Sequence, residues 1–175
     1  MKRRIAIDMD EVMAFTVQKI VNRYQETFGC QLSSADLAGK LVEDAVPLDR
    51  RQTVLDWIAE KGFFRDLPVM EDAQRVVYEL HQNYEVFVVS AANQLPNSLS
   101  EKLEWLQEHF DFISWRNTVF CGYKSIINAD YMIDDHARNI NIFQGKGLLF
   151  SAHHNVYENG FHRVNDWKEV EKTFL

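Results

Sequence analysis

Four carboxylates stand at the ends of two short apolar segments of the chain: Asp8, Asp10, Asp134 and Asp135. If those segments are neighbouring strands of a parallel sheet, the carboxylates meet at the edge where such sheets bind ligands. Converging carboxylates repel one another unless a divalent cation lies among them, and hard oxygen ligands suit magnesium. One acidic residue after a strand is more often a cap or a turn residue, so the prediction of a Mg²⁺ site rests on the four together.

Two further polar residues share this placement. Ser90 ends the apolar run 86–89, and Lys124 lies on the approach to the acidic pair. Alone, a serine at a strand end is usually a turn former, and a lone lysine is usually a solvated surface charge. Beside the carboxylates, a cation and a few donors in one pocket would let an acidic protein bind a small phosphate ester.

Short strands and amphipathic helices are the elements expected to position these residues. Four apolar segments rich in β-branched or aromatic residues are predicted strands: 5–7, 86–89, 131–133 and 148–150. The segment 118–120 is a weaker candidate. Apolar residues recur at helical spacing between them, over 17–28, 73–80, 99–110 and 167–174. Apolar strands that alternate with helices indicate a parallel sheet covered on both faces, so the predicted fold class is a doubly wound α/β core.

Some local details are predicted from single residues. Gly29 is expected to end the helix over 17–28. Ser98 is expected to open the helix over 99–110, with Glu101 completing a capping box. His153 and His154 are expected in a surface loop and not at a second metal site, because adjacent histidines in a strand point to opposite faces.

Residues 16–64 interrupt the alternation of strands and helices. The stretch carries helical patterns, including one over 48–58 that begins after Pro47 and is stopped by Gly62, and no convincing strand. We interpret it as a helical insertion over the sheet. The chain would then consist of a core, residues 1–15 and 65–175, and the insertion 16–64.

Length, charge and cysteine content narrow the class of protein. A chain of 175 residues, 46% of them hydrophobic, is expected to bury one core. A net charge of −7 argues against a nucleic-acid polymer as the main partner, because such binders spread basic residues over a face. Cys30 and Cys121 are expected to be free thiols, and no signal segment or membrane span is predicted, so a cytoplasmic protein is expected. The sequence leaves the oligomeric state open.

The order of these residues resembles the four motifs of the haloacid-dehalogenase superfamily. Those motifs are a strand ending in Asp-x-Asp-x-Thr/Val, a strand ending in Ser or Thr, a downstream Lys, and a strand ending in an acidic pair. In this chain they read Asp8-Met9-Asp10-Glu11-Val12, Val88-Val89-Ser90, Lys124 and Ile133-Asp134-Asp135. The resemblance spans residues 5–135, and it implies that the insertion is a small cap.

The resemblance implies a magnesium-dependent phosphatase that works through an aspartyl-phosphate. Asp8 would attack phosphorus, and Asp10 would protonate the leaving oxygen and later deprotonate the attacking water. Mg²⁺ would be held by Asp8, by the backbone carbonyl of Asp10 and by the acidic pair, with Asp135 as the direct ligand and Asp134 as its support. The second motif and the downstream lysine, that is Ser90, Ala91 and Lys124, would bind the phosphoryl oxygens.

Within the superfamily, the sequence is most similar to the 5′(3′)-deoxyribonucleotidases. The similarity lies in residues 8–12, the segments 62–68 and 100–105, and the spacing from Lys124 to the acidic pair. It implies a nucleoside monophosphate as the small phosphorylated substrate. Phe15, Phe63 and Phe64 would line the pocket and stack on the base, although a phenylalanine pair that only packs the cap onto the core is the competing interpretation.

Several positions depart from the nucleotidase pattern. Ser90-Ala91-Ala92 stands where those enzymes have Thr-Ser-Pro, Gln94 replaces a lysine, and Gly122 replaces an arginine. Each lost charged contact to a phosphate would cost about 1.5–3 kcal/mol. Glu11 stands where many relatives have glycine, and we expect it to cap the first helix.

Three competing functions remain open at this point. One is a phosphatase for another small ester, such as a sugar phosphate. Another is a non-catalytic haloacid-dehalogenase-like domain, whose expected mark is loss of Asp8 or Asp10, and both are present. The third is a phospho-acceptor receiver domain, but its acceptor aspartate would follow a middle strand, where this chain has Ser90.

Overall fold

The computed structural model describes residues 2–175 and contains a six-stranded parallel sheet with the strand order β3-β2-β1-β4-β5-β6. The strands are β1 (Arg4–Ile7), β2 (Glu85–Ser90), β3 (Thr118–Phe120), β4 (Tyr131–Asp134), β5 (Lys146–Phe150) and β6 (His162–Val164). The five predicted strands are confirmed. The short edge strand β6 was not predicted, because its three residues carry no apolar run.

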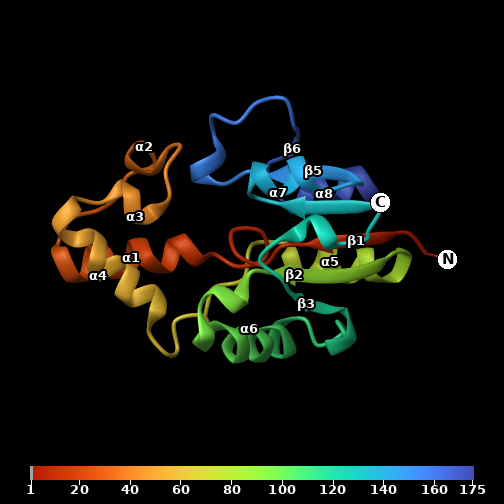
Figure 1. Cartoon of the computed structure of the whole chain (residues 1–175), viewed down its shortest axis with the longest axis horizontal. Helices are drawn as coiled ribbons and strands as arrows, with labels where there is room; N and C mark the ends of the chain where they lie inside the picture. The colour runs from red at the N-terminus through yellow and green to blue at the C-terminus, as the bar shows by residue number, and fades with distance from the viewer. Residues whose placement is uncertain (1) are drawn as a thin grey trace.

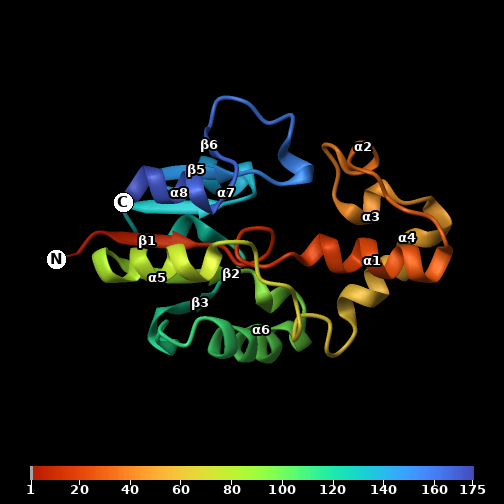
Figure 2. The same ribbon diagram turned by 180° about the vertical axis from the view of Figure 1, so that it is seen from behind.

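Helices connect the strands on both faces of the sheet. They are α1 (Thr16–Phe28), α2 (Ser34–Leu37), α3 (Val42–Ala45), α4 (Leu48–Ala59), α5 (Ala73–Asn83), α6 (Pro96–His109), α7 (Ala137–Ile142) and α8 (Trp167–Phe174). Figure 1 shows α7 in front of the sheet, and Figure 2 shows α5 and α8 on the opposite side. The doubly wound α/β class is therefore confirmed.

Alternating residues of β1 divide the core into two layers. Ile5 and Ile7 belong to the larger apolar cluster with side chains of α5 and α8, whereas Ala6 belongs to a smaller cluster with Phe143 after α7. Strand residues point alternately to the two faces of a sheet, so a strand covered on both faces is apolar throughout. This is why β1 reads as an uninterrupted apolar run.

The strand order reverses beside β1, and this reversal places the polar strand ends together. Ile7 pairs with Val88 of β2 on one side and with Ile133 of β4 on the other. Asp8, Ser90 and the acidic pair therefore leave the sheet at the same edge. Ligands of doubly wound sheets bind in the crevice that forms where the order reverses.

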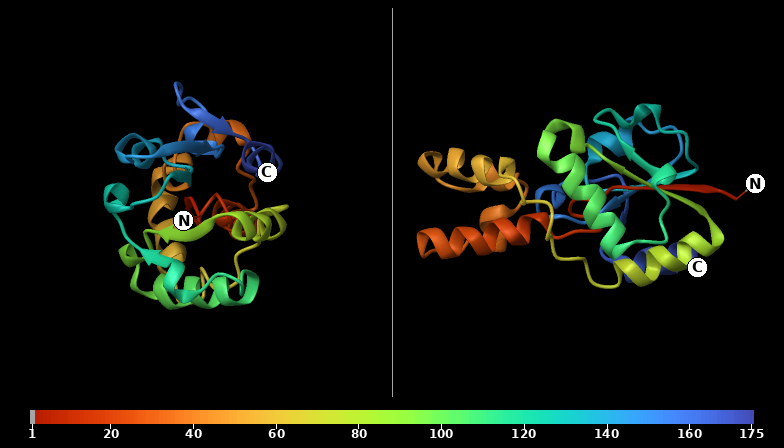
Figure 3. Two further views of the ribbon diagram at one scale, coloured as in Figure 1. Left: turned by 90° about the vertical axis from the view of Figure 1, so that its right-hand side faces the viewer. Right: turned by 90° about the horizontal axis from the view of Figure 1, so that it is seen from below.

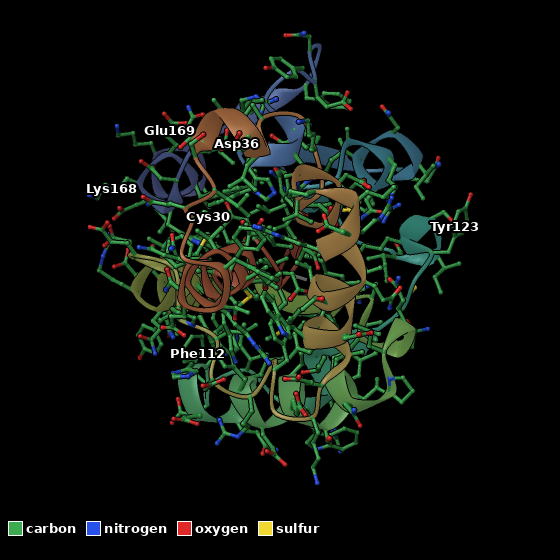
Figure 4. All side chains as sticks on the ribbon, turned by 90° about the vertical axis from the view of Figure 1, so that its left-hand side faces the viewer. Cys30, Asp36, Phe112, Tyr123, Lys168 and Glu169 are labelled. Atoms are coloured by element: carbon green, nitrogen blue, oxygen red, sulfur yellow. The ribbon has the colours of Figure 1, made fainter. Side chains whose placement is uncertain are left out.

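Helices α1 to α4 lie together beyond this edge of the sheet, as the views in Figures 1 and 3 agree. Figure 4 looks onto this end of the molecule, where Cys30 and Asp36 are labelled. Helix α1 ends at Gly29, which adopts the left-handed conformation with φ 66°. Glu11 accepts a hydrogen bond from the backbone N–H of Val17, 2.8 Å away, in the first turn of α1. The predicted end and the predicted cap of this helix are both confirmed.

The start of α6 differs from the prediction. The helix begins at Pro96 after Leu95, so Ser98 lies inside its first turn and donates its hydroxyl to the carbonyl oxygen of Ala92. Glu101 does not complete a capping box, because its carboxylate accepts the backbone N–H groups of Gly62 and Phe64. A proline at the first position of a helix needs no hydrogen-bond partner, and this favours the earlier start.

The buried face of α6 is also more polar than the sequence pattern predicts. The buried residues of this helix are Ser98, Glu101, Lys102, Trp105 and Leu106. The predicted apolar stripe contained Leu99 and Leu103, which are only half-buried. Helix α6 thus turns two charged side chains toward the interior, one toward the segment after α4 and one toward the strand ends.

Two further expectations concern the cysteines and the membrane. Cys30 and Cys121 are both free thiols, as predicted. Among the described residues, none of the helices combines the length and the apolar character that a membrane crossing requires.

Candidate active site

Asp8 is the first residue after β1, and its carboxylate is held by two donors. The backbone N–H of Met9 donates to Oδ1 at 2.8 Å, and Nζ of Lys124 lies 2.9 Å from the same oxygen. The backbone N–H of Asp8 continues the sheet by donating to the carbonyl of Ile133. Both contacts to the carboxylate use Oδ1, which leaves Oδ2 for a ligand.

Lys124 bridges the ends of β1 and β4. Its Nζ lies 2.7 Å from Oδ2 of Asp134, and its side chain is 2% exposed. Both carboxylate oxygens of Asp134 have further partners. Asn139 donates its side-chain amide to both oxygens, and His136 donates its backbone N–H to Oδ1. Asp134 therefore positions the lysine, and it has no oxygen left over for an ion.

Asp135 differs from its neighbour in this respect. Its Oδ1 is buried and has no hydrogen-bond partner among residues 2–175. Its backbone carbonyl accepts from the side-chain amide of Asn155 at 2.7 Å and lies 3.1 Å from Nε2 of His154. A buried carboxylate oxygen without a donor is costly, and this arrangement is typical of a metal ligand.

The carboxylate of Asp10 lies between two partners at the start of the helical region. Thr16 donates its hydroxyl to Oδ1 at 3.0 Å, and Lys102 forms an ion pair with Oδ2. Nζ of Lys102 also donates to the hydroxyl of Ser90 at 3.1 Å. Lys102 is 3% exposed and its ammonium lies near the ring of Phe64, 4.6 Å from the centroid.

Lys102 is the main residue that sequence reasoning missed. The departures at Gln94 and Gly122 predicted a site poor in cations, whereas α6 supplies a buried ammonium from another direction. The signal in the sequence was weak: Ser98 and Lys102 are four residues apart and share one helical face. Only the packing of α6 against the strand ends distinguishes this lysine from a solvated one.

Burial shifts the proton affinities of the central groups. Burial raises the pKa of Asp8, although the ammonium of Lys124 works in the opposite direction. Burial, followed by the charge of Asp8, raises the pKa of Asp135 well above its ordinary value. Burial alone would lower the pKa of Lys124, but Asp8 and Asp134 raise it, so this lysine keeps its charge.

The charges of the cluster fit a divalent cation. Asp8, Asp10 and the acidic pair carry four negative charges when ionised, and Lys102 and Lys124 offset two of them. Carboxylate oxygens of Asp8, Asp134 and Asp135 lie within 4.8 Å of one another, and all three residues are buried. The buried aspartate cluster can therefore hold a metal ion, and its oxygen donors suit a hard one.

A cavity of about 500 Å³ opens above this cluster, between the strand ends and the helical region. Six of the predicted site residues line it, Asp8, Asp10, Phe64, Ala91, Lys124 and Asp135, as do Gln94 and Gly122. The wall from α3 and α4 consists of Glu43, Gln52, Leu55, Asp56, Ile58 and Ala59. The cations lie on the sheet side, and hydrogen-bonding groups without a positive charge lie on the opposite side.

Of the three phenylalanines predicted to line the pocket, only Phe64 does so within residues 2–175. Phe63 is buried, with its ring edge to face against Phe64 at 4.9 Å between centroids. Phe15 is partly exposed, at 36%, but borders no part of this cavity. The packing interpretation therefore holds for Phe63, because the turn after α4 points its ring into the core.

Glu11 and the two histidines lie closer to the site than the sequence indicated. Glu11 has φ 53°, a left-handed conformation that favours glycine, which fits the glycine common at this position in the family pattern. The prediction of a surface loop for His153 and His154 is wrong, because both are half-buried in a short 3₁₀ turn, η4 (His153–Asn155). His154 reaches Asp135, and Nδ1 of His153 lies 3.8 Å from Glu11 Oε2.

Comparison with known proteins decides the family. The model of the family described as "5' nucleotidase, deoxy (Pyrimidine), cytosolic type C protein" matches residues 2–175. The chain belongs to this family. The 5′(3′)-deoxyribonucleotidase of Bacillus subtilis is 42% identical over 178 residues and covers 100% of both chains. A relative from Staphylococcus epidermidis is 43% identical over 173 residues, covering 99% of this chain and 96% of its own.

Membership of the nucleotidase family confirms the predicted resemblance and the predicted class of enzyme, a phosphomonoester hydrolase. Solved structures agree with the fold. A haloacid dehalogenase-like hydrolase from Streptococcus pneumoniae superposes with a TM-score of 0.64 at 11% identity, covering 99% of each chain. The HAD-type chain YfnB of Bacillus subtilis, solved bound to magnesium, gives a TM-score of 0.61 at 11% identity and covers 99% of this chain and 98% of its own.

Proposed function

We propose that the chain hydrolyses 5′- or 3′-phosphate monoesters of deoxyribonucleosides through an aspartyl-phosphate on Asp8, with Mg²⁺ bound. The main support for the proposal is that the carboxylates at this sheet edge differ in their hydrogen-bond donors. Lys124 and Met9 hold one oxygen of Asp8, while the buried Oδ1 of Asp135 is left without a donor. Metal-assisted phosphoryl transfer requires a nucleophile positioned by a cation, as Asp8 is by Lys124, and a nearby oxygen that can bind the metal, as Oδ1 of Asp135 can.

The residues divide the first half-reaction among them. Asp8 Oδ2 attacks phosphorus, and the bond to the leaving ester oxygen breaks. Asp10 delivers a proton to that oxygen, which leaves as the nucleoside hydroxyl. Lys124, Ser90 and Lys102 surround the expected position of the phosphoryl oxygens, and their donors offset the charge that develops there.

The second half-reaction returns the enzyme to its starting state. Asp10, now a carboxylate, takes a proton from a water molecule, whose oxygen attacks phosphorus and releases Asp8. Thr16 donates a hydrogen bond to Oδ1 of Asp10 and so fixes its orientation in both steps. Asp10 therefore serves as the acid in the first half-reaction and as the base in the second, so one residue is sufficient for both proton transfers.

Asp8, Asp135 and the backbone carbonyl of Asp10 would hold Mg²⁺, and Asp134 would support them through Lys124. When bound, the ion supplies positive charge that reduces the repulsion between the carboxylate nucleophile and the phosphate dianion. The proposal is supported by the buried aspartate cluster and by the magnesium in the structure of the Bacillus subtilis HAD-type chain.

We further propose that residues 16–64 act as the cap and that the cavity beneath them takes one nucleoside monophosphate. Phe64 supplies an aromatic face at the junction of cap and core. The cap wall brings Glu43, Gln52 and Asp56 to the end of the cavity opposite the lysines, so the anionic end of the substrate faces the core. The cytosolic description of the family supports a cytosolic location for the reaction.

The decisive experiment combines a substrate panel with capture of the intermediate. Phosphate release is measured for deoxyribonucleotides, ribonucleotides and sugar phosphates, with Mg²⁺ and with EDTA. Asp10→Asn is then mixed with the best substrate and examined by intact-mass spectrometry, where a phosphoryl adduct on Asp8 is expected. Absence of Mg²⁺-dependent hydrolysis for every ester contradicts the proposal.

A sugar phosphate is the second candidate substrate. Besides Phe64, the lining includes two carboxylates and an amide on the side of α3 and α4, and such groups accept hydrogen bonds from sugar hydroxyls. Cleavage of sugar phosphates alone in the same panel would select this candidate and leave the mechanism unchanged.

A further inference from the structure

A second and smaller cavity, of about 160 Å³, adjoins the reaction centre between the helical region and η4. Seven side chains with metal-binding atoms line it: Asp10, Glu11, Glu43, Asp135, His136, His153 and His154. The mechanism above uses only Asp10 and Asp135 from this set. Three imidazoles and several carboxylates facing one cavity call for a separate explanation.

We propose that this cavity binds a second, transition-metal ion such as Zn²⁺, with Oδ2 of Asp135 and Nε2 of His136 and His154 as its ligands. Magnesium prefers oxygen donors, whereas imidazole nitrogen suits zinc and its neighbours in the first transition series. The two sites would therefore differ in the ion they select, and Asp135 would belong to both.

The distances between the donor atoms fit one ion. Asp135 Oδ2 lies 3.5 Å from His154 Nε2 and 4.0 Å from His136 Nε2, and one ligand atom from each of the three residues falls within 4.8 Å of the others. Bonds of about 2.0–2.1 Å in a tetrahedral site place neighbouring ligand atoms about 3.4 Å apart. The three ligand atoms are close to that spacing, and a small movement of the side chains toward one another would reach it.

The orientation of the rings agrees with a shared ligand. The imidazoles of His136 and His154 lie 4.5 Å apart between centroids, inclined by 30°, so both present nitrogen to the same side of Asp135. The contacts at Oδ2 leave Oδ1 of Asp135 for magnesium. A carboxylate that bridges two ions in this way is common in two-metal sites.

Two buried polar atoms at this cavity lack a hydrogen-bond partner among residues 2–175, one on a proposed ligand residue and one beside it. Oδ1 of Asp135, whose side chain is 4% exposed, and Nε2 of His153 have no hydrogen-bond partner in the part of the chain that the structure describes. Both residues line the small cavity. Oδ1 of Asp135 is the atom left for Mg²⁺, and Nε2 of His153 lies outside the proposed Zn²⁺ ligand set, so the Zn²⁺ site rests on the spacing of the three ligand atoms.

Binding would also rearrange one hydrogen bond. Nε2 of His154 lies 3.1 Å from the carbonyl oxygen of Asp135, and a ring nitrogen that binds a metal must give up its proton. Zn²⁺ binding at this site would therefore require the tautomer of His154 with its proton on Nδ1, while Asn155 continues to hold the carbonyl oxygen.

The experiment measures Zn²⁺ binding directly and does not depend on turnover. The full chain is saturated with Mg²⁺ and titrated with Zn²⁺ by calorimetry in two buffers of different ionisation enthalpy. We expect one high-affinity Zn²⁺ per chain. His136→Asn and His154→Asn should each weaken binding by about 10-fold or more, in line with the loss of an orienting or coordinating group.

A matched control is His162→Asn, an exposed histidine on β6 that should leave Zn²⁺ affinity unchanged. Thermal unfolding of the metal-free variants verifies that each is folded, and His136→Gln provides a second variant if one is not. Zn²⁺ that merely displaces Mg²⁺ from Asp8 and Asp135 would bind both histidine variants as tightly as the wild type. That result, or no binding by the Mg²⁺-saturated wild type, overturns the proposal whether or not the chain cleaves nucleotides.

Discussion

The two walls of the main cavity are built in different ways. On the sheet side, Asp8, Lys124 and Asp134 are buried and hold one another through contacts of 2.7–2.9 Å. On the opposite side, Asp56 is exposed, and its described hydrogen bond is with Gln52 on the same helix. Buried charges with several partners cannot move without a large cost, whereas exposed side chains of one helix can. The proposed reacting groups are therefore held in place before a substrate binds, and the side chains of the proposed cap can change position.

Several specific contacts, called joints below, connect the helical region to the core. Glu101 of α6 holds the backbone of Gly62 and Phe64 where the chain leaves α4. At the other side, the backbone N–H of Gly39 donates to the carbonyl of His153, and the ring of Tyr157 packs so closely that a Cβ on Gly39 would lie 2.5 Å from it. Movement of the helical region would have to break one of these joints.

The largest effect is expected from the fixed wall. Asp8→Asn removes the nucleophile and should lower kcat by about 10³-fold or more, since the covalent step is lost. Asp130→Asn is the matched control, because Asp130 lies at the opposite end of β4 and accepts the backbone N–H of Arg4. Steady-state phosphate release measures both variants. If Asp8→Asn and Asp130→Asn had similar activity, the sheet side of the cavity would not contain the reacting groups.

The next effect concerns Glu11, which links the first motif to α1. Burial raises the pKa of Glu11 to about 7 from 4.5. The folded state then binds more protons than the unfolded state between these values, so the contribution of Glu11 to stability is complete below pH 4.5 and is lost as the pH rises toward 7. In EDTA, which keeps the protein free of metal, raising the pH over this range should lower the free energy of unfolding of the wild type by up to about 3 kcal/mol relative to that of Glu11→Gln.

Urea unfolding of both proteins at several pH values tests this expectation. Glutamine retains an oxygen that can accept from the backbone N–H of Val17, so the helix cap is preserved in the variant. Parallel stability curves for the two proteins would show that Glu11 is ionised normally and is not part of the buried wall.

Lys102 tests whether α6 belongs to the reactive wall. Lys102→Met leaves Asp10 and Ser90 without their ammonium and should lower kcat/KM by about 10- to 100-fold, the value of a charged hydrogen bond. Lys168→Met serves as the control, because Lys168 is exposed and forms only loose surface ion pairs. Equal kinetics of the two variants would assign Lys102 to packing alone.

A smaller effect is expected at the joint. Glu101→Gln places an amide N–H or a single oxygen opposite the backbone donors of Gly62 and Phe64, and should lower the free energy of unfolding by about 1–2 kcal/mol. Glu104→Gln, an exposed position on the same helix, should change it by less than about 0.5 kcal/mol. Denaturant titration compares them, and an unchanged midpoint for the Glu101 variant would argue against a joint here.

The smallest effect is expected on the variable wall. Asp56→Asn should alter KM by less than about fivefold and leave kcat unchanged, since this side chain is exposed and distant in sequence from the reacting groups. Asp49→Asn, elsewhere on α4, provides the comparison. A large loss of kcat in the Asp56 variant would place part of the reactive machinery on the cap.

The sequence predicted the site residues that lie at the ends of strands or directly after them. Asp8 and the acidic pair were identified because apolar strand runs end at them, and the register of β1 with β2 and β4 then follows from the parallel sheet. The prediction missed Lys102, which reaches the site from helix α6, and His154, which reaches it from the turn η4. Periodicity showed Leu99 and Leu103 as the buried stripe of α6, but packing rotated that helix toward its polar face.

By itself, the sequence determined the α/β class, the five main strands and the carboxylates at their ends, because these depend on local apolar patterns and on chain direction. Tertiary structure alone decided that Lys102 enters the site beside Lys124 and that Phe64 is the phenylalanine that faces the cavity. The reason is physical: whether a charge is solvated or buried depends on neighbours far along the chain, and no local pattern encodes how those neighbours pack.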